Sequence, residues 1–246
     1  EKLGSKIRYK ANVKEILIKN NKAFGVKLTN GEELFAKNII SNSTRWDTFG
    51  LNIDKKGLVN QKFVNKKEYT WSKNYKPSPS FVSIHIGVDK KIINSNFNCH
   101  HIIVEDWAAL EDEKGVIFIS IPTLLDENLA PEGKHIIHAF TPSSMHEWDG
   151  LTRKEYLKKK ETYYEFIISK ISTLIPAIKD YIDHKEIGTP KTHKRFLGRF
   201  EGSYGPIPRK KLLGLLPMPF NTTNINNLYC VGDSCFPGQG LNAVAF

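Results

Sequence analysis

The segment that most constrains the fold of this chain is its final stretch, residues 228–246, which reads LYCVGDSCFPGQGLNAVAF. The pattern predicts a short buried strand that ends at Gly232-Asp233, then a glycine-rich turn, then an apolar helix that begins near Leu241. This order suits a dinucleotide. An Asp after a strand accepts a hydrogen bond from a ribose or ribityl hydroxyl, glycines let the backbone approach a pyrophosphate, and a helix N-terminus offers free N–H groups.

The same segment has a simpler interpretation. Gly-Asp after a strand also forms an ordinary tight turn, and Pro237-Gly238-Gln239-Gly240 also forms an ordinary loop. For Gly232-Asp233 alone the tight turn is the better interpretation. The whole order of strand, Gly-Asp, Gly-x-Gly and helix favours a flavin or a related dinucleotide.

The first fifty residues predict a β-meander. Its expected strands cover residues 6–11, 13–19, 23–28 and 33–41, with Asn30-Gly31 as a type I′ hairpin signal. Residues 54–79 are polar, Lys-rich and interrupted by prolines, as in a crossover between domains. A meander of this kind occurs in flavin domains and in many other β proteins, so it does not decide the fold alone.

The middle of the chain predicts strands followed by a helix. The strands are expected at residues 81–88, 101–105, 116–122 and 135–140. Residues 116–121 are apolar at nearly every position, which indicates a strand covered on both faces. His135 and His138 lie three residues apart and should point to opposite faces of their strand. Thr152 and Glu155 form a capping box before a helix over residues 152–182, which Pro176 should interrupt, leaving a short helix over residues 177–182.

Composition and charge limit the classes of function. The formal charge is +10, but Lys outnumbers Arg about five to one and is scattered, which is typical of a biased genome composition. Contact with anionic lipid is the second interpretation of the charge, and no nucleic-acid partner is expected because clustered Arg with exposed aromatics is missing. The three cysteines indicate a reducing compartment, and Cys99-His100-His101 lacks a partner motif, so no metal site is expected.

Several segments resemble one family in the order in which they occur. They are Tyr9–Val13, Phe24–Val26, Ile40–Gly50, Gly188–His193, Tyr204–Pro208, Leu216–Thr223 and the final stretch. Together they resemble the carotenoid isomerases (prolycopene isomerases) of the phytoene-desaturase-like FAD-dependent oxidoreductase superfamily. The resemblance spans nearly the whole chain and is least specific at residues 56–185.

The resemblance implies a set of FAD-binding residues. Gly232 and Asp233 would bind the ribityl and pyrophosphate part, and Val13 would meet the adenine through its backbone. The strand end at Ser41 and Asn42 would lie near the adenosine. The loop and helix start beside the flavin would be lined by Gly238, Gly240, Leu241 and Asn242. Without the resemblance, Val13 is an ordinary strand residue and Asn42 an ordinary turn former.

The resemblance also implies the fold class and domain organisation. We expect an α/β protein with an α+β insert: the C-terminal part of a Rossmann-like FAD-binding domain, with an inserted antiparallel-sheet-plus-helix substrate domain. Residues 1–53 and 225–246 would belong to the FAD-binding domain and residues 54–224 to the substrate-binding domain. No Gly-x-Gly-x-x-Gly follows a strand here, and the chain has no initiating Met. We therefore expect a C-terminal fragment that alone binds FAD poorly and is inactive.

By resemblance, the activity would be conversion of poly-cis lycopene (prolycopene) to all-trans lycopene with reduced FAD. The alternatives are a carotenoid desaturase or a retinol-saturase-like oxidoreductase, and a non-catalytic basic binding domain. No catalytic residue stands out, although Glu201 and Tyr204 are the polar residues to test first. A substrate tunnel would be lined by Trp71, Phe81, Trp107 and Phe118. The expected location is the cytoplasmic side, peripheral to a photosynthetic or cytoplasmic membrane. The sequence does not indicate the oligomeric state.

Overall fold

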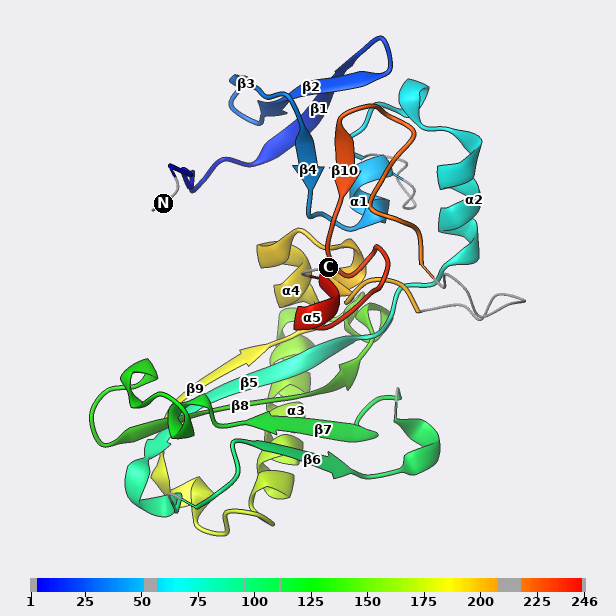
Figure 1. Cartoon of the computed structure of the whole chain (residues 1–246). Helices are drawn as coiled ribbons and strands as arrows, with labels where there is room; N and C mark the ends of the chain where they lie inside the picture. Colours follow the sequence, from blue (N-terminus) through cyan, green and yellow to red (C-terminus); the bar gives the residue numbers. More distant parts are fainter. Residues whose placement is uncertain (1–3, 51–56, 95, 111, 208–217, 245–246) are drawn as a thin grey trace. The chain divides into compact units, whose positions relative to one another are not determined.

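The computed structural model describes residues 4–50, 57–94, 96–110, 112–207 and 218–244. The chain forms two compact units (Figure 1). Unit 1 consists of Glu1–Ser78 and Tyr204–Phe246, and unit 2 consists of Pro79–Ser203. Each unit has its own hydrophobic core, so the two are described separately.

Unit 1 begins with a three-stranded antiparallel sheet in the order β1-β2-β3. The strands are β1 (Val13–Lys19), β2 (Lys22–Leu28) and β3 (Glu33–Phe35). Asn20 and Asn21 take positive φ angles of 50° and 55° in the turn between β1 and β2, as expected for Asn, which tolerates the left-handed region. Ile16 and Ala23 point into the core of this unit.

A second sheet in unit 1 consists of two parallel strands, β4 (Ile39–Ser41) and β10 (Leu228–Cys230). Alternate residues of both strands are buried, which places Ile39, Leu228 and Cys230 in the core. Helices α1 (Arg45–Phe49) and α2 (Lys66–Asn74) belong to this unit, with the short α5 (Leu241–Val244) and a 3₁₀ turn at Gln61–Phe63. Trp71 of α2 is buried against Trp46 of α1, with ring centroids 4.9 Å apart.

Unit 2 is built on a five-stranded antiparallel sheet in the order β6-β7-β8-β5-β9. The strands are β5 (Ser80–Asp89), β6 (His100–Val104), β7 (Val116–Ser120), β8 (Lys134–Ser143) and β9 (Ile182–Gly188). Residues alternate between the two faces, as the strand period of two requires. His135 is buried on one face of β8 and His138 lies half-buried on the other, which confirms the expectation for this pair.

Helix α3 (Arg153–Ile171) lies across one face of this sheet (Figure 1). Its N-terminus has the expected capping box, because Glu155 N donates to Thr152 Oγ1 and Thr152 N donates to Glu155. Its buried side chains, among them Tyr163, Ile167 and Ile171, pack against the sheet with Ile84, Ile117 and Ile137. The helix ends at Ile171, before Pro176, and a 3₁₀ turn at Ile178–Tyr181 stands where a second short α-helix was expected.

The remaining elements of unit 2 are short. They are the α-helix α4 (Pro190–Leu197) and 3₁₀ turns at Lys90–Ile92, Trp107–Ala109, Pro122–Leu124, Glu127–Leu129, Met145–Trp148 and Phe200–Gly202. Within the described part of the chain, no helix is both long and apolar enough to cross a membrane.

Three further expectations about elements were wrong, and two elements were missed. Residues 6–11 form turns and irregular backbone and no strand. Residues 33–41 form two strands, because Ala36 and Lys37 divert the chain from the meander to the pair with β10. Strand β9 and helix α2 were not expected. The face of β7 away from α3 is only half-buried at Phe118 and Ser120, so the strand is not fully covered on both faces.

The mixed α/β fold class, with an antiparallel sheet and a helix inserted into another unit, is confirmed. The limits of the two compact units differ from the expected domain limits. Helix α2 and residues 218–224 lie in unit 1, whereas the sequence placed them with the insert. Ser78 N donates to Gly205 O, which joins the two parts of unit 1 at this limit. The functional assignment of the domains stays a prediction.

Candidate functional site

The candidate site lies at the carboxyl ends of β4 and β10, which are neighbours in Figure 1. Val231 N donates to Ser41 O at 2.9 Å, so the parallel pairing continues one residue past β10. The next residues, Asn42 after β4 and Gly232-Asp233 after β10, therefore emerge side by side. Ligands bind at this end of parallel strands in open α/β sheets. The structure thus brings together four of the expected residues from opposite ends of the sequence.

A glycine is required at position 232 both by the backbone conformation and by the neighbouring atoms. Its φ is +90°, and a Cβ at this position would lie 2.5 Å from Asn42 Oδ1. A third segment also reaches the turn at Gly205, whose φ is +78°. A Cβ on Gly205 would lie 2.5 Å from the backbone oxygen of Asp233. Glycine at both positions allows three backbones to meet around Asp233, which is half-buried.

The glycine-rich loop continues from this turn. Gly238 and Gly240 have φ angles of +118° and +97°, and no atom lies within 4 Å of the Cβ position of Gly240. Gln239 Nε2 donates a hydrogen bond to Tyr204 O, which ties the loop to the segment of Gly205. Leu241 and Asn242 begin α5, and their side chains lie outside the described residues. The loop therefore presents open backbone beside the strand ends.

Helix α1 fixes the other side of the site. Thr44 caps the helix by accepting from Asp47 N at 3.2 Å, and Arg45 N donates to Ser234 Oγ at 3.1 Å. Ser41 Oγ and Thr48 Oγ1 are hydrogen-bonded at 2.8 Å in the core. These contacts hold the turn after β4 against the turn after β10.

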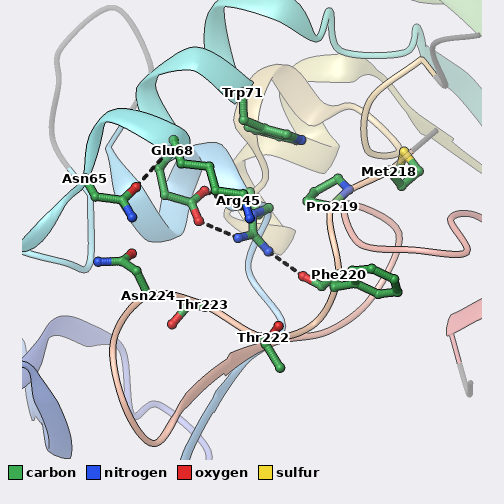
Figure 2. A pocket seen from close by; sticks show the side chains of 11 residues that line it. Arg45, Asn65, Glu68, Trp71, Met218, Pro219, Phe220, Thr222, Thr223 and Asn224 are labelled. Carbon is green, nitrogen blue, oxygen red and sulfur yellow. Dashed lines mark hydrogen bonds and ion pairs between the residues drawn. The ribbon is translucent and has the colours of Figure 1, made fainter. Parts of the chain in front are cut away.

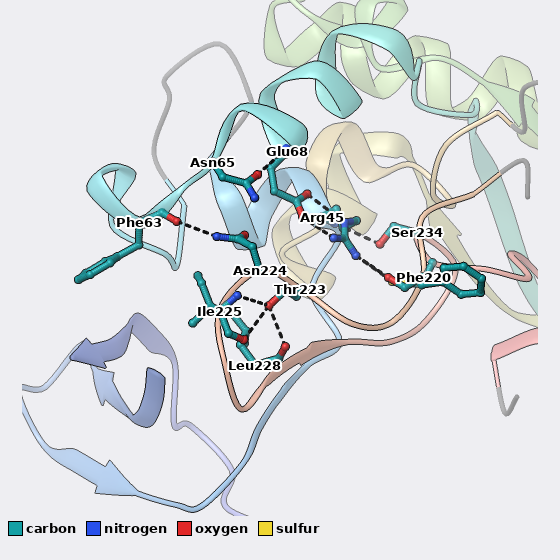
Figure 3. A network of polar contacts seen from close by, with 11 residues as sticks. Arg45, Phe63, Asn65, Glu68, Phe220, Thr223, Asn224, Ile225, Leu228 and Ser234 are labelled. Carbon is teal, nitrogen blue, oxygen red and sulfur yellow. Dashed lines mark hydrogen bonds and ion pairs between the residues drawn. The ribbon is translucent and has the colours of Figure 1, made fainter. Parts of the chain in front are cut away.

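A buried ion pair lies next to these turns (Figure 3). Arg45 and Glu68 form a two-point contact, with Nη2 to Oε1 at 2.5 Å and Nε to Oε2 at 3.2 Å. Arg45 Nη1 also donates to Phe220 O at 2.9 Å and contacts Cys235 Sγ at 3.8 Å. Burial opposes the charge of Arg45, but the hydrogen-bonded Glu68 carboxylate opposes this effect, and the pKa of Arg45 is raised. Burial also raises the pKa of Cys230 to about 12, so this thiol stays protonated.

The ion pair forms one wall of a cavity of about 370 Å³ (Figure 2). The other walls come from α2 and from residues 218–224. Trp71 Nε1 has no hydrogen-bond partner among the described residues. Thr223 Oγ1 donates to Ile225 O and Leu228 O, which fixes this wall to the start of β10 (Figure 3). Sequence reasoning missed Arg45 and Glu68 as a pair, because nothing in the spacing of the two residues indicates their contact.

The other expected residues are distributed over both units. Val13 begins β1 in the other sheet of unit 1 and is 37% exposed. Trp71 belongs to unit 1, whereas Phe81, Trp107 and Phe118 belong to unit 2, where Trp107 is 80% exposed. Glu201 lies in unit 2 with a positive φ of 51° and Tyr204 lies in unit 1. The expected tunnel residues therefore come from both units.

Comparison with known proteins identifies relatives of this chain. Prolycopene isomerase 2 of an Oncidium hybrid cultivar is 56% identical over 245 residues, which are 99% of this chain and 41% of that protein. The prolycopene isomerase of carrot (Daucus carota) is 55% identical over 99% of this chain and 39% of that protein. This chain is a homologue of the prolycopene isomerases. It spans about two fifths of the length of these relatives.

No protein-family model matches the chain. Among solved structures, an oxidoreductase from Methanosarcina mazei matches 95% of this chain and 46% of that protein, with 18% identity and a TM-score of 0.56. This similarity shows a shared fold. It agrees with the fold class expected from the sequence.

The comparison corrects the expected location. Both prolycopene isomerase relatives are described as chloroplastic. The expected location on the cytoplasmic side of a photosynthetic or cytoplasmic membrane is therefore wrong, and the relatives indicate a plastid.

Proposed function

We propose that the protein carrying this chain isomerises a poly-cis carotenoid, prolycopene, to its all-trans form. The observation that carries the proposal is 55–56% identity to prolycopene isomerases over 99% of the chain. Because the chain spans about two fifths of these relatives, the activity is proposed for the full-length protein. The alternative, a net oxidation or reduction of the carotenoid, uses the same kind of flavin motif and is separated from isomerisation by the mass of the product.

We further propose that FAD is the cofactor and that the ends of β4 and β10 hold part of it. The geometry there suits a dinucleotide. Gly240 leaves backbone uncovered by side chains, and the Asp233 carboxylate lies three residues after the end of β10. In this proposal Gly232 and Asp233 contact the ribityl and pyrophosphate part, while Ser41 and Asn42 lie near the adenosine.

The remaining proposed contacts come from two other segments. Gly238, Gly240, Leu241 and Asn242 would line the loop beside the flavin, and Val13 would meet the adenine through its backbone. The chemistry that reduced FAD supplies when bound is a reversible sharing of electrons with the conjugated chain, which lowers the order of a double bond. The part of this chain is to orient the cofactor and to keep the polyene in an apolar environment from which water is excluded.

We propose that the protein draws its apolar substrate from a membrane by peripheral contact. The formal charge of +10 supports attraction to anionic lipid. Helix α4 also carries two exposed apolar side chains, Phe196 and Leu197, which are 74% and 58% exposed, next to Lys194 and Arg195. An exposed apolar pair flanked by cations is suited to the interface of a bilayer.

The experiment that tests the activity uses the full-length protein. It is incubated without oxygen with reduced FAD and poly-cis lycopene in liposomes, and the products are separated by liquid chromatography with mass detection. An all-trans product of unchanged mass is expected. A product two hydrogens lighter or heavier would replace the isomerase with a desaturase or a saturase.

A further inference from the structure

One face of the sheet in unit 2 carries a row of flat rings. Side chains of β5, β7 and β8 that face α3 form the buried core, while Phe81, Phe118 and Phe140 lie half-buried on the opposite face. The register explains their alignment, since Phe118 is the direct partner of Phe140 across β7 and β8. Phe81 lies diagonally across from Phe140, because the partner of Phe140 on β5 is Ser83.

The rings are in continuous contact. The Phe118 and Phe140 centroids are 4.9 Å apart with planes 15° from parallel, and the Phe140 and Phe81 centroids are 4.8 Å apart. His193 of α4 extends the row, at 4.9 Å from Phe81. A branch leaves Phe140 through His138 at 5.6 Å and ends at His85, whose ring stacks on His138 at 4.3 Å and 11°. We refer to these six residues as the ring row.

The three phenylalanine rings of the row are apolar, and two of its histidines have lowered pKa values. Burial, with the neighbouring His85 and His193, lowers the pKa of His138 to about 4, and burial also lowers the pKa of His193. The carboxylates and the lysine on this face lie at its margins. Glu186 is on the edge strand β9, and Asp89 and Lys134 are register partners at the far end of β5 and β8. At the opposite edge, Ile102 pairs with Phe118 and is 61% exposed, which extends the apolar surface onto β6.

We propose that the ring row is the surface on which the conjugated chain of the carotenoid lies. This inference rests on the proposed function and names the part of unit 2 that holds its substrate. Aromatic rings present flat, polarisable faces that stack on other π systems. An uncharged polyene offers no hydrogen-bond partner, so a charged surface would lose hydration without compensation. Stacked rings can orient the polyene by van der Waals contact alone. They form no hydrogen bonds with it that would oppose rotation about its double bonds.

Binding is measured separately from turnover. An achiral polyene gains a visible circular dichroism signal when a protein holds it in one chiral orientation, so titration of poly-cis lycopene into the full-length protein reports binding without isomerisation. Phe118→Leu and Phe140→Leu should each weaken this binding about threefold to tenfold, as loss of one aromatic contact predicts. Phe97→Leu is the matched control, because Phe97 is also half-buried and contacts a histidine ring, His101, at 4.5 Å, away from the row.

The histidine branch provides a test that does not depend on loss of packing. His138→Phe keeps a flat uncharged ring and should bind within twofold of the wild type, whereas His138→Lys places a charge in the row and should weaken binding more than tenfold. Wild-type binding in the two Leu variants, or tighter binding by His138→Lys than by His138→Phe, would overturn the proposal. So would the lack of any induced signal in the wild type.

The two proposals fail in different ways. A wild-type protein that gives the induced signal but forms no all-trans product would disprove the isomerase and leave the ring row as a polyene site. A protein that isomerises poly-cis lycopene, and whose binding and KM are unchanged by Phe118→Leu and Phe140→Leu, would keep the activity and remove the ring row from it.

Discussion

At the scale of single residues, Gly232 and Gly31 form a natural comparison. Their φ angles are +90° and +91°, a conformation that side chains with a Cβ rarely adopt. A Cβ at Gly31 would have no atom within 4 Å, whereas a Cβ at Gly232 would meet Asn42 Oδ1 at 2.5 Å. Asn42 is exposed, so its side chain can move aside. A substitution at either position therefore strains the backbone in the same way. Only the substitution at Gly232 also displaces Asn42, a neighbouring residue of the candidate site.

We expect Gly31→Ala and Gly232→Ala to lower the free energy of unfolding by a similar amount, about 1–2 kcal/mol, because both force a Cβ into the left-handed region. Only Gly232→Ala should weaken FAD binding by the full-length protein, because only this change displaces Asn42. Urea denaturation and FAD titration measure the two effects. Equal FAD affinity of the two variants would argue against the cofactor contact at Gly232 and Asn42.

His138 makes a separate prediction about pH. Its pKa is about 4 in the folded protein, because of burial and the neighbouring His85 and His193, and about 6.5 in an unfolded chain. Between these values the unfolded chain binds a proton that the folded protein does not, so stability falls as the pH decreases from about 6.5 to 4. Since the ring is partly open to solvent, we expect a loss of about 1–2 kcal/mol rather than the full value of the shift.

His138→Phe should remove this part of the acid sensitivity. His135 and His193 also have lowered pKa values and remain in the variant, so the difference between the two proteins isolates His138. The measurement is urea denaturation at pH 7 and at pH 4.5. Ile102→Phe is the control, because it adds a ring at an exposed site on β6 without changing a titratable group, and it should leave the pH dependence unchanged. An equal change of stability with pH in both variants would show that the pKa of His138 is not lowered in the folded protein.

At the scale of elements, local sequence signals correctly predicted the features that are stabilised by contacts within one element or to the core. The capping box of Thr152 and Glu155 and the core spacing of α3 were both correct. Strand β9 was missed because residues 183–186 are polar and exposed, and the strand forms only by pairing with β5. Helix α2 was missed in a Lys-rich stretch although Asn65 caps it by accepting from Glu68 N. Propensity is weak where tertiary pairing decides the structure.

A buried ion pair links α1 and α2 of unit 1. The Arg45 and Glu68 side chains are 3% and 6% exposed. Removing one partner of such a pair leaves a buried charge without compensation, so Glu68→Gln should lower the free energy of unfolding by about 3–5 kcal/mol. Glu33→Gln is the control, because its pair with Lys27 at 3.3 Å is exposed and should contribute less than about 1 kcal/mol. Chemical denaturation compares the variants, and similar losses would contradict the buried role.

At the scale of the whole molecule, the candidate site consists of segments from both ends of the chain. The strand and glycine pattern predicted Gly232 and Asp233, the family resemblance implied Ser41 and Asn42, and the parallel pairing of β4 and β10 brings the four together. The sequence did not predict the Arg45 and Glu68 contact or the ring row. Both depend on which residues face one another across elements, and this register cannot be obtained from periodicity alone.

The sequence also predicts the affinity of the isolated chain for FAD. No Gly-x-Gly-x-x-Gly fingerprint follows a strand in these 246 residues, so the backbone donors that such a motif directs at a pyrophosphate are missing from the sequence. We expect the isolated chain to bind FAD weakly or not at all in equilibrium dialysis, and the full-length protein to bind it. Tight stoichiometric binding by the isolated chain would show that the ends of β4 and β10 are sufficient.

The division of unit 1 between two distant segments also affects the time at which it can fold. Arg45 and Ser234, which contact each other beside these strands, are 189 residues apart, and all of unit 2 is synthesised between them. Unit 2 is continuous in sequence and can fold while the ribosome still holds the later residues. Until β10 has been synthesised, the edge of β4 that pairs with β10 has no hydrogen-bond partner there. An unpaired strand edge can pair with other chains and so favours aggregation. During synthesis, chaperone dependence should therefore concentrate on the early residues of unit 1 and end when β10 emerges.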